Sequence, residues 1–328
     1  MRAATVLISV PKLADEGMAR LAEAGVRTIF MKQGASDADL AATLAAEPVD
    51  ALVLRTLGLD GDAIRACPTL KVISRHGSGY NGVDIAAASA RRIPVFIAPA
   101  ANSQSVAELA VGLMLAVART IPAHDAAFRR GEWHRSTVGT QLGGRTLGLI
   151  GIGAIGSRVA AAARALGMTV VAFDRFVTPD KVPAGITLVP TLDAMLPRAD
   201  VLSIHCPLTP ETTGLVGRDA LARLPYGAIL INTARGPLVD ETALMDALAS
   251  GQLGGAGLDT LVDEPPPADS PFRSMPNVVI TPHVGGNTRA ALGAVAAVAV
   301  DNALRVLRGD AVDRRLCVNP DVLDGKDK

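Results

Sequence analysis

Cysteine is scarce in this sequence. Only three cysteines occur in 328 residues, and Cys67, Cys206 and Cys317 are isolated from one another, with no C-x-x-C spacing. The sequence therefore supports neither a disulfide framework nor a zinc site, and we expect no bound metal. Isolated cysteines of this kind are typical of the reducing cytosol, so we expect a cytoplasmic protein.

An excess of either charge is also absent. Thirty-two Lys and Arg residues balance thirty-two Asp and Glu residues, which gives a net charge of zero and a pI near 7.0. No global positive field favours nucleic acid or an anionic membrane surface, and we expect neither as a partner. The balance favours a small neutral or anionic ligand.

Long hydrophobic runs are missing as well. The longest, at 109–118 and 290–300, reach about half the length of a bilayer span and are bounded by charged residues. We expect no membrane-spanning segment. The apolar stretch Val6–Val10 precedes Pro11 and lacks the core of about 7 to 15 apolar residues that a secretory signal needs. It is interpreted as a first β-strand.

The sequence does contain enough apolar residues to fold. Hydrophobic residues make up 49% of the chain and charged residues 20%, and the length predicts about two domains. Short β-branched runs alternate with Ala-rich amphipathic runs, the pattern of βαβ units with parallel sheets. A first series of five strands is predicted at Thr5–Val10, Val26–Phe30, Ala51–Leu54, Val72–Ser74 and Val95–Ile97, with helices at Ala14–Ala24, Asp37–Ala46 and Gly61–Cys67.

A second series predicts a doubly wound sheet of six parallel strands. These strands are expected at Thr146–Ile150, Thr169–Phe173, Val201–His205, Ala228–Asn232, Gly255–Leu258 and Val278–Thr281.

Two long helices are expected to connect the two series. Ser105 and Glu108 fit a capping box that would start a helix ending before Pro122, and a second helix is predicted at Thr288–Arg308. If the second helix returns to the first series, the chain divides into 1–98 plus 287–328 and 99–286, with a cleft at the crossover. The expected fold class is thus α/β, with two domains built on parallel sheets.

The most specific local motif is a glycine-rich turn. Gly151, Gly153 and Gly156 lie between a predicted strand and a predicted helix, where glycines allow a pyrophosphate to approach the helix N-terminus. Asp174 ends the next strand, 18 residues after Gly156, near the spacing of an acid that binds the adenosine ribose. A carboxylate there repels a 2′-phosphate, which favours NAD over NADP, although Arg175 could partly offset the repulsion.

Four motifs, taken in order, carry a resemblance to a known family. The order G-I-G-A-I-G, I-N-T-A-R-G, G-L-D with E-P, and T-P-H resembles the D-isomer-specific 2-hydroxyacid dehydrogenases over essentially the whole chain. The resemblance implies two Rossmann-like domains, the first of them completed by the C-terminal helix and binding substrate. It also implies an NAD-binding second domain and a homodimer built on that domain.

The family's site residues are carried over residue by residue. The resemblance implies that Arg235 binds the substrate carboxylate and keto oxygen, and that His283 is the acid/base with Glu264 as its partner. It implies that the loop at Gly77, Ser78 and Gly79 binds the carboxylate. The cofactor is expected at Gly151, Gly153, Ala154, Ile155, Gly156, Asp174, Arg175, Cys206, Pro207, Thr209, Thr233, Ala234, Asp259 and Gly285.

The substrate stays open among small 2-oxo and 2-hydroxy acids. Arg55 and Arg75 resemble residues of the 3-phosphoglycerate dehydrogenases and could meet a phosphate, but hydroxypyruvate and glyoxylate reductases are equally compatible. From a different class, the carboxy-terminal-binding transcriptional corepressors use this fold to sense dinucleotides and recognise peptides. They keep the Arg, Glu and His set, so these three residues do not separate the two interpretations.

Overall fold

The structure, a computed structural model, describes residues 2–324 and divides the chain into two compact units. Unit 1 comprises Met1–Asn102 and Asn287–Lys328, and unit 2 comprises Ser103–Gly286. The chain leaves unit 1 after Asn102 and returns at Asn287. The predicted boundaries were residue 98 for the first crossing and residue 287 for the return.

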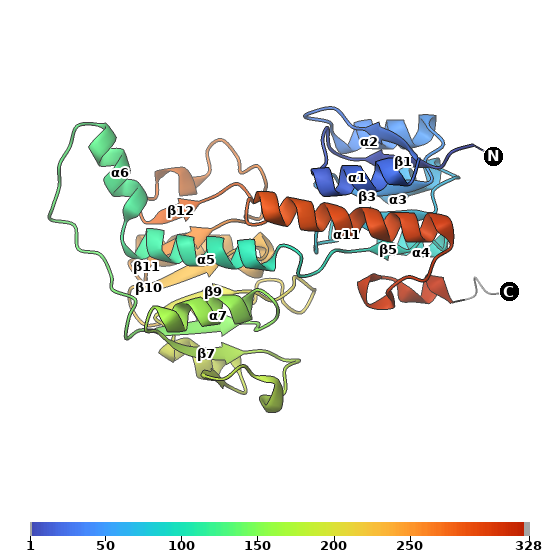
Figure 1. Cartoon of the computed structure of the whole chain (residues 1–328). Helices are drawn as coiled ribbons and strands as arrows, with labels where there is room; N and C mark the ends of the chain where they lie inside the picture. Colours follow the sequence, from blue (N-terminus) through green and yellow to red (C-terminus); the bar gives the residue numbers. More distant parts are fainter. Residues whose placement is uncertain (1, 325–328) are drawn as a thin grey trace. The chain divides into compact units, whose positions relative to one another are not determined.

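Unit 1 is built on a five-stranded parallel sheet in the order β2-β1-β3-β4-β5 (Figure 1). Its strands match the first predicted series to within two residues at each end: β1 Thr5–Ile8, β2 Arg27–Phe30, β3 Ala51–Leu54, β4 Val72–Arg75 and β5 Val95–Phe96. The helices are α1 Asp15–Glu23, α2 Asp37–Ala46, α3 Gly61–Ala66, α4 Ile85–Ala90 and α11 Arg289–Arg308. Of these, α4 is short and Ala-rich and was not predicted.

The C-terminal helix α11 completes the core of unit 1. It lies beside α1 and packs on β3 and β4 (Figure 1), and its buried residues include Ala296, Val300 and Leu304. By length and composition alone α11 is apolar enough to cross a membrane, but half of its most apolar stretch is buried inside the unit. Its apolar character is that of a core helix.

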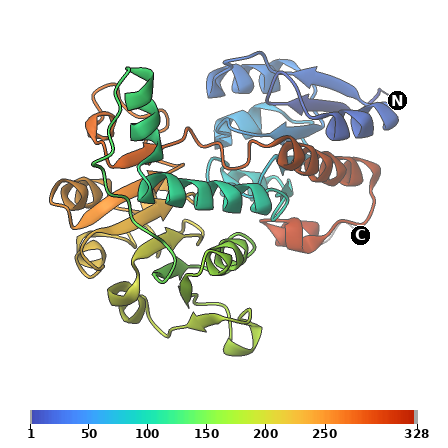
Figure 2. The same cartoon turned by 60° about the vertical axis from the view of Figure 1, so that its left-hand side comes forward.

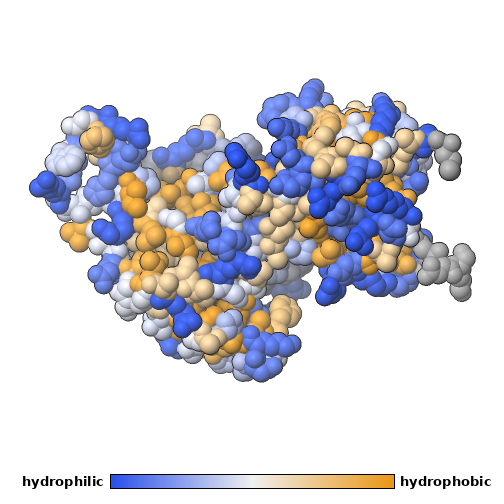
Figure 3. Space-filling model, viewed as in Figure 1, coloured by the Kyte–Doolittle hydropathy of each residue, from blue (hydrophilic) through white to orange (hydrophobic). Residues whose placement is uncertain are grey.

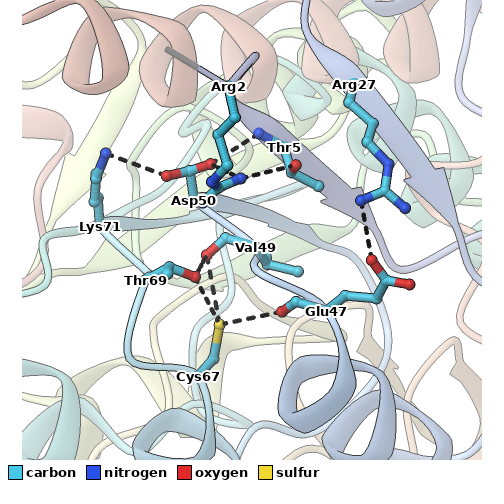
Figure 4. A network of polar contacts seen from close by, with 9 residues as sticks. All are labelled: Arg2, Thr5, Arg27, Glu47, Val49, Asp50, Cys67, Thr69 and Lys71. Carbon is cyan, nitrogen blue, oxygen red and sulfur yellow. Dashed lines mark hydrogen bonds and ion pairs between the residues drawn. The ribbon is translucent and has the colours of Figure 1, made fainter.

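A polar network closes the amino-terminal edge of this sheet (Figure 4). Asp50 is 4% exposed, accepts a hydrogen bond from the Thr5 N–H at 2.9 Å, and pairs with Arg2 and Lys71 at 3.0 and 3.1 Å. Cys67 is buried beside it and donates to the Val49 carbonyl at 3.4 Å. The buried carboxylate is therefore fully compensated.

Unit 2 is a seven-stranded parallel sheet in the order β12-β11-β10-β9-β6-β7-β8. Its strands are β6 Thr146–Ile150, β7 Thr169–Phe173, β8 Ile186–Leu188, β9 Val201–Ile204, β10 Ala228–Asn232, β11 Leu253–Leu258 and β12 Val278–Ile280. The prediction of six strands was wrong because it missed β8. This strand has three residues, lies at the edge and is not fully buried, so it lacks the continuous apolar run that marks a central parallel strand.

Helices cover both faces of this sheet. On one face lie α5 Ser103–Ala118 and α7 Gly156–Ala165 (Figure 2), and α8 Leu192–Met195, α9 Arg218–Ala222 and α10 Glu241–Ala249 belong to the core of the other face. The predicted capping box was wrong: α5 begins at Ser103, so Ser105 lies inside the helix and is buried. The Glu108 carboxylate accepts from the Gln104 side chain instead.

The segment after α5 forms an arm of unit 2. Helix α6, Ile121–Arg129, follows a two-residue break at which Thr120 has a left-handed backbone, and Pro122 lies in its first turn. Phe128 and Trp133 meet edge to face at 6.2 Å, and the Arg135 guanidinium lies 6.0 Å from the Trp133 ring. Both aromatic rings are nevertheless largely exposed.

Candidate active site

The glycine-rich turn joins β6 to α7 and requires glycine at two positions. Gly151 has φ +91°, and a Cβ there would lie 2.9 Å from the His205 carbonyl oxygen. A Cβ on Gly156 would overlap the carbonyl oxygen of Gly151. Gly153 differs, because no atom lies within 4 Å of the place its Cβ would take. The turn thus leaves one open side, as a pyrophosphate requires.

The N-terminus of α7 is suited to an anion. Its N-cap residue, Ile155, makes no side-chain hydrogen bond to the helix, and the first turn contains no acidic residue. The backbone N–H groups and the positive end of the helix dipole are therefore not neutralised by the protein's own carboxylates. The residues of the turn fit a bound dinucleotide phosphate.

Asp174, at the carboxyl end of β7, is held in place by backbone amides. One oxygen accepts from the Ile152 N–H at 2.9 Å, and the other accepts from Phe176 and Val177 at 2.9 and 3.2 Å. The carboxylate therefore ties the glycine-rich turn to the segment after β7. Arg175 is exposed, and both residues line a cavity of about 820 Å³ whose other walls are mostly apolar.

The segment after β9 passes directly under the glycine-rich turn. A Cβ on Gly151 would lie 3.0 Å from the Cys206 amide nitrogen, and Thr209 begins a turn in which its N–H donates to the Thr212 hydroxyl at 2.8 Å. Pro207 accepts from the same hydroxyl through its carbonyl. Burial raises the pKa of the Cys206 thiol to about 11, so it stays protonated. Within residues 2–324, no group of three His, Cys, Asp or Glu side chains could hold a metal ion.

Arg235 follows β10 in a turn shaped by Asn232. The Asn232 side chain accepts from the Ala234 N–H at 3.0 Å and donates to the Arg235 carbonyl at 2.8 Å. Burial lowers the pKa of the Arg235 guanidinium, although the charge of Glu264 opposes this. Among the described residues no carboxylate forms an ion pair with Arg235. A desolvated cation without a paired carboxylate attracts an anion.

Asp259, after β11, is 2% exposed and holds the loop that follows β12. Its carboxylate accepts from the Thr281 hydroxyl at 2.6 Å and from the Val284 and Gly285 N–H groups at 2.9 and 2.8 Å. The Asp259 carbonyl also accepts from the His283 N–H at 2.9 Å. Asp259 was predicted to contact the cofactor, and its anchoring of the histidine loop was not predicted.

His283 occupies a strained backbone position and pairs with Glu264. Its φ is +52°, a left-handed conformation that is uncommon outside glycine and is sustained here by the Asp259 contacts. The Nδ1 atom lies 2.7 Å from the Glu264 carboxylate, whose other oxygen accepts from the Leu261 N–H at 3.0 Å. The Nε2 edge of the ring is left for a further partner.

The Glu264 carboxyl is kept ionised by its neighbours. Partial burial raises its pKa, but the hydrogen bond and charge of His283, the Leu261 N–H and the charge of Arg235 outweigh this. The pKa of Glu264 therefore lies below its ordinary value. A carboxylate hydrogen-bonded to imidazole fixes which nitrogen carries the proton and stabilises the imidazolium.

The residues predicted for the carboxylate-binding loop and for a distal phosphate belong to unit 1. Gly77 has φ +151° and, like Gly153, open space where a Cβ would lie, and Ser78 is exposed. Arg75 donates to the Gly79 carbonyl at 2.8 Å and to the Leu57 carbonyl at 3.5 Å, so it shapes this glycine loop.

Arg55 and His76 lie near one another in the same unit. Arg55 donates to the Asn287 side chain at 2.6 Å, and burial lowers the pKa of its guanidinium. Burial, together with the charge of Arg55, lowers the pKa of His76 to about 4. In the described part of the chain, Arg55 forms no ion pair with a carboxylate.

Within unit 2 the predicted residues gather at one edge of the sheet. They follow the carboxyl ends of six adjacent strands of the sheet, in the order β12, β11, β10, β9, β6 and β7. Thr233 and Ala234 are part of this edge, and the Thr233 hydroxyl is buried with no partner among the described residues. Open α/β sheets bind ligands at this edge.

Comparison with known proteins gives matches over the whole fold. Residues 111–285 match the family described as D-isomer specific 2-hydroxyacid dehydrogenase, NAD binding domain. A D-3-phosphoglycerate dehydrogenase of Mycobacterium bovis is 46% identical over 249 residues, which are 75% of this chain and 47% of that protein. The chain thus spans about half the length of the curated relatives it matches.

Two solved structures resemble the chain along nearly its whole length. The TT0316 protein of Thermus thermophilus is 38% identical, with a TM-score of 0.87, and 96% of this chain and 99% of that chain are covered. A glyoxylate reductase of Paecilomyes thermophila is 28% identical, with a TM-score of 0.85 and coverage of 97% and 99%. These matches confirm the predicted α/β fold class with Rossmann-like architecture, and the family match confirms the prediction of NAD as the cofactor.

Proposed function

Because the chain belongs to the D-isomer specific 2-hydroxyacid dehydrogenase family, we propose that it is an NAD-dependent D-2-hydroxyacid dehydrogenase. The reaction is the reversible transfer of hydride between NADH and a small 2-oxo acid. The observation that carries the proposal is the pairing of His283 with Glu264 at 2.7 Å, in a unit that also contains a desolvated Arg235 with no paired carboxylate among residues 2–324.

The chemistry divides among these three side chains. Bound NADH supplies the hydride for the keto carbon. His283, with Nδ1 fixed by Glu264, delivers the proton from Nε2 to the keto oxygen, and in the oxidative direction neutral imidazole takes it back. Arg235 binds the carboxylate and the keto oxygen with two of its N–H groups, which a lysine could not do in the same plane.

The cofactor is proposed to bind at the carboxyl edge of the sheet of unit 2. The turn from Gly151 to Gly156, with Ala154 and Ile155 between them, binds the pyrophosphate. The residues proposed to contact the rest of NAD are Asp174, Arg175, Cys206, Pro207, Thr209, Thr233, Ala234, Asp259 and Gly285. The Asp174 carboxylate has lone pairs left for a ribose hydroxyl and repels a 2′-phosphate, which favours NAD over NADP.

Substrate binding is proposed to involve the glycine loop of unit 1. The backbone amides of Gly77, Ser78 and Gly79 bind the substrate carboxylate, and Arg75 acts by holding the loop. Arg55 is suited to an anionic distal group, since it is desolvated and its side-chain partner is the neutral Asn287. The candidate substrates are hydroxypyruvate, glyoxylate and 3-phosphohydroxypyruvate.

We propose a cytoplasmic homodimer assembled through unit 2. Apolar side chains gather over α5 (Figure 3), where Leu109, Val111 and Leu115 are only partly buried. The arm adds Phe128 and Trp133, which are 63% and 71% exposed. Exposed large apolar groups of this kind on one unit are typical of an interface between subunits.

The test is oxidation of NADH by the purified protein, followed at 340 nm with a panel of 2-oxo acids and repeated with NADPH. Turnover of hydroxypyruvate, glyoxylate or 3-phosphohydroxypyruvate, with NADH preferred, is the expected result. Tight NADH binding without turnover of any 2-oxo acid would contradict the proposal and favour a dinucleotide-sensing interaction protein.

A further inference from the structure

Two consecutive backbone amides fix the turn that carries Glu264, and each donates to a carboxylate. The Leu261 N–H donates to Glu264 itself at 3.0 Å, and the Val262 N–H donates to Glu241 at 2.7 Å. Glu264 belongs to the turn, whereas Glu241 is the first residue of α10. The second contact therefore ties the turn to a helix of the core.

The place from which Glu241 acts is rigid. Asp240 is the N-cap of α10 and accepts from the Ala243 N–H at 3.0 Å, and Ala243 and Leu244 are buried in the core of unit 2. A carboxylate in the first helical turn also lies at the positive end of the helix dipole. Glu241 is thus a fixed point against which the turn can be held.

The turn is also enclosed on the side of Arg235. A Cβ on Gly236 would overlap the carbonyl group of Leu261 and the amide nitrogen of Val262, so the backbone after Arg235 packs directly on this peptide. The same peptide bond is therefore in contact with Gly236 and, through its N–H, with Glu241. A displacement of this peptide would move Glu264 relative to both Arg235 and His283.

We propose that Glu241 is a positioning residue for the Glu264–His283 pair. By accepting the Val262 N–H it keeps the turn in the conformation in which one Glu264 oxygen takes the Leu261 N–H and the other faces His283 Nδ1. The contribution to catalysis rests on the dehydrogenase function proposed above, and the contribution to geometry does not.

The anchor requires an acceptor oxygen at the right distance and does not require a negative charge. Burial raises the pKa of Glu241, and the nearby charge of Asp263 adds to this. Together they outweigh the hydrogen bond from the Val262 N–H, which lowers the pKa, so the surroundings favour the neutral form of this carboxyl. The carbonyl oxygen of a neutral side chain of the same length accepts the same hydrogen bond. A shorter carboxylate keeps the charge but does not reach Val262.

Two variants separate this role from simple stabilisation of α10. Glu241→Gln keeps the length and loses the charge, whereas Glu241→Asp keeps the charge at the helix N-terminus and loses the reach. Positioning predicts that Glu241→Asp lowers kcat about tenfold with little change in NADH affinity, and that Glu241→Gln stays within about threefold of wild type. Asp246→Asn, on the same helix and paired with Arg218 at 2.6 Å, is the matched control and keeps wild-type kcat.

A second readout does not depend on turnover. In the wild type, a hydrogen-bonded imidazole N–H of His283 should give a low-field proton resonance, assigned by its loss in His283→Asn. It should weaken in Glu241→Asp and persist in Glu241→Gln. If Glu241→Asp retains both kcat and the resonance, or if Glu241→Gln is the more damaged variant, the positioning role is wrong. If the wild type turns over no 2-oxo acid, the proposed function fails while the resonance still tests the geometry.

Discussion

The two units place a helix at the same point of a similar sheet, but only one of these helices is suited to a phosphate. In unit 1 the strand order turns at β1, which lies between β2 and β3, and in unit 2 it turns at β6, between β7 and β9. Such switch points are where open α/β sheets bind ligands. Topology alone therefore makes the N-termini of α1 and α7 equal candidates.

The residues around the two helices make the difference. Neither α1 nor α7 has a side-chain cap, but the first turn of α1 contains Asp15 and Glu16, which neutralise the helix dipole and repel an anion. The turn before α1, residues 9–14, contains no glycine, whereas the turn before α7 contains Gly151 and Gly153, and α7 itself begins with Gly156. The topology thus provides two positions for a phosphate site, and the local sequence favours the one in unit 2.

The proton-transfer chemistry is likewise proposed for unit 2, and the largest effect should come from its histidine. His283→Asn should lower kcat by about 10²-fold or more while NADH affinity changes little. Asparagine is chosen because it tolerates the left-handed backbone of His283 better than alanine. Steady-state kinetics and NADH titration provide the measurement.

The matched control for that variant is His76→Asn in unit 1. The pKa of His76, about 4, leaves the ring neutral at pH 7, so it has no imidazolium proton to transfer there. A loss of kcat in His76→Asn equal to that in His283→Asn would refute the division of chemistry between the units.

The next largest effect should distinguish the two desolvated arginines. Arg235→Lys should lower kcat/KM roughly tenfold or more for every 2-oxo acid. The lysine ammonium cannot donate two parallel hydrogen bonds to the carboxylate and keto oxygens, as a planar guanidinium does. Arg55→Lys should reduce kcat/KM only for a substrate with an anionic distal group, such as 3-phosphohydroxypyruvate. Equal losses on glyoxylate in both variants would show that Arg55 does not act at the distal end.

The open side of the glycine-rich turn gives a third test. Gly153→Val should weaken NADH binding about tenfold or more without lowering the melting temperature, because the added atoms enter space that only the cofactor is expected to fill. Gly112→Ala in α5 is the control, since a Cβ added at Gly112 would also meet no atom within 4 Å. Unchanged NADH affinity in Gly153→Val would place the pyrophosphate elsewhere.

Sequence patterns were sufficient for the parts of the fold that periodicity and apolar runs encode. The central strands and the long helix α11 were predicted to within two residues. The strand β8 and the helix α4 were missed because elements of three and six residues are too short to show a clear hydrophobic periodicity. The Ser105 capping box failed because the motif also occurs inside helices. A cap is defined by the backbone, and the backbone puts the start of α5 at Ser103.

For the candidate site, the sequence indicated residue types but not the supporting contacts. The motif order named Arg235, Glu264 and His283, yet the anchoring of the His283 loop by Asp259 and of the Glu264 turn by Glu241 depends on which amides lie nearby. The partners in these contacts are separated by 26 and 21 residues. Contacts of this kind form only when the strands pair in register, so the sequence alone does not predict them.

A smaller effect is expected at Asp174, whose carboxylate both faces the proposed ribose position and holds three backbone amides. Asp174→Asn removes the charge and keeps one acceptor oxygen, so the ratio of kcat/KM for NADPH to that for NADH should rise several-fold. The melting temperature should fall slightly, since fewer of the Ile152, Phe176 and Val177 amides can be satisfied. An unchanged coenzyme ratio would assign the discrimination to Arg175.

The smallest effect concerns stability, and here the units should behave alike. Burial lowers the pKa of His205 in unit 2 to about 4, and burial together with Arg55 does the same for His76 in unit 1. Between pH 6.5 and about 4 the unfolded chain binds a proton at each histidine that the folded chain does not bind, so stability is fully present above pH 6.5 and falls as the pH drops. His205→Gln, which can still contact Ser203, should reduce this dependence for unit 2 and leave that of unit 1 unchanged. Denaturant unfolding at a series of pH values measures both, and equal slopes in wild type and variant would mean that His205 is not neutral in the folded protein.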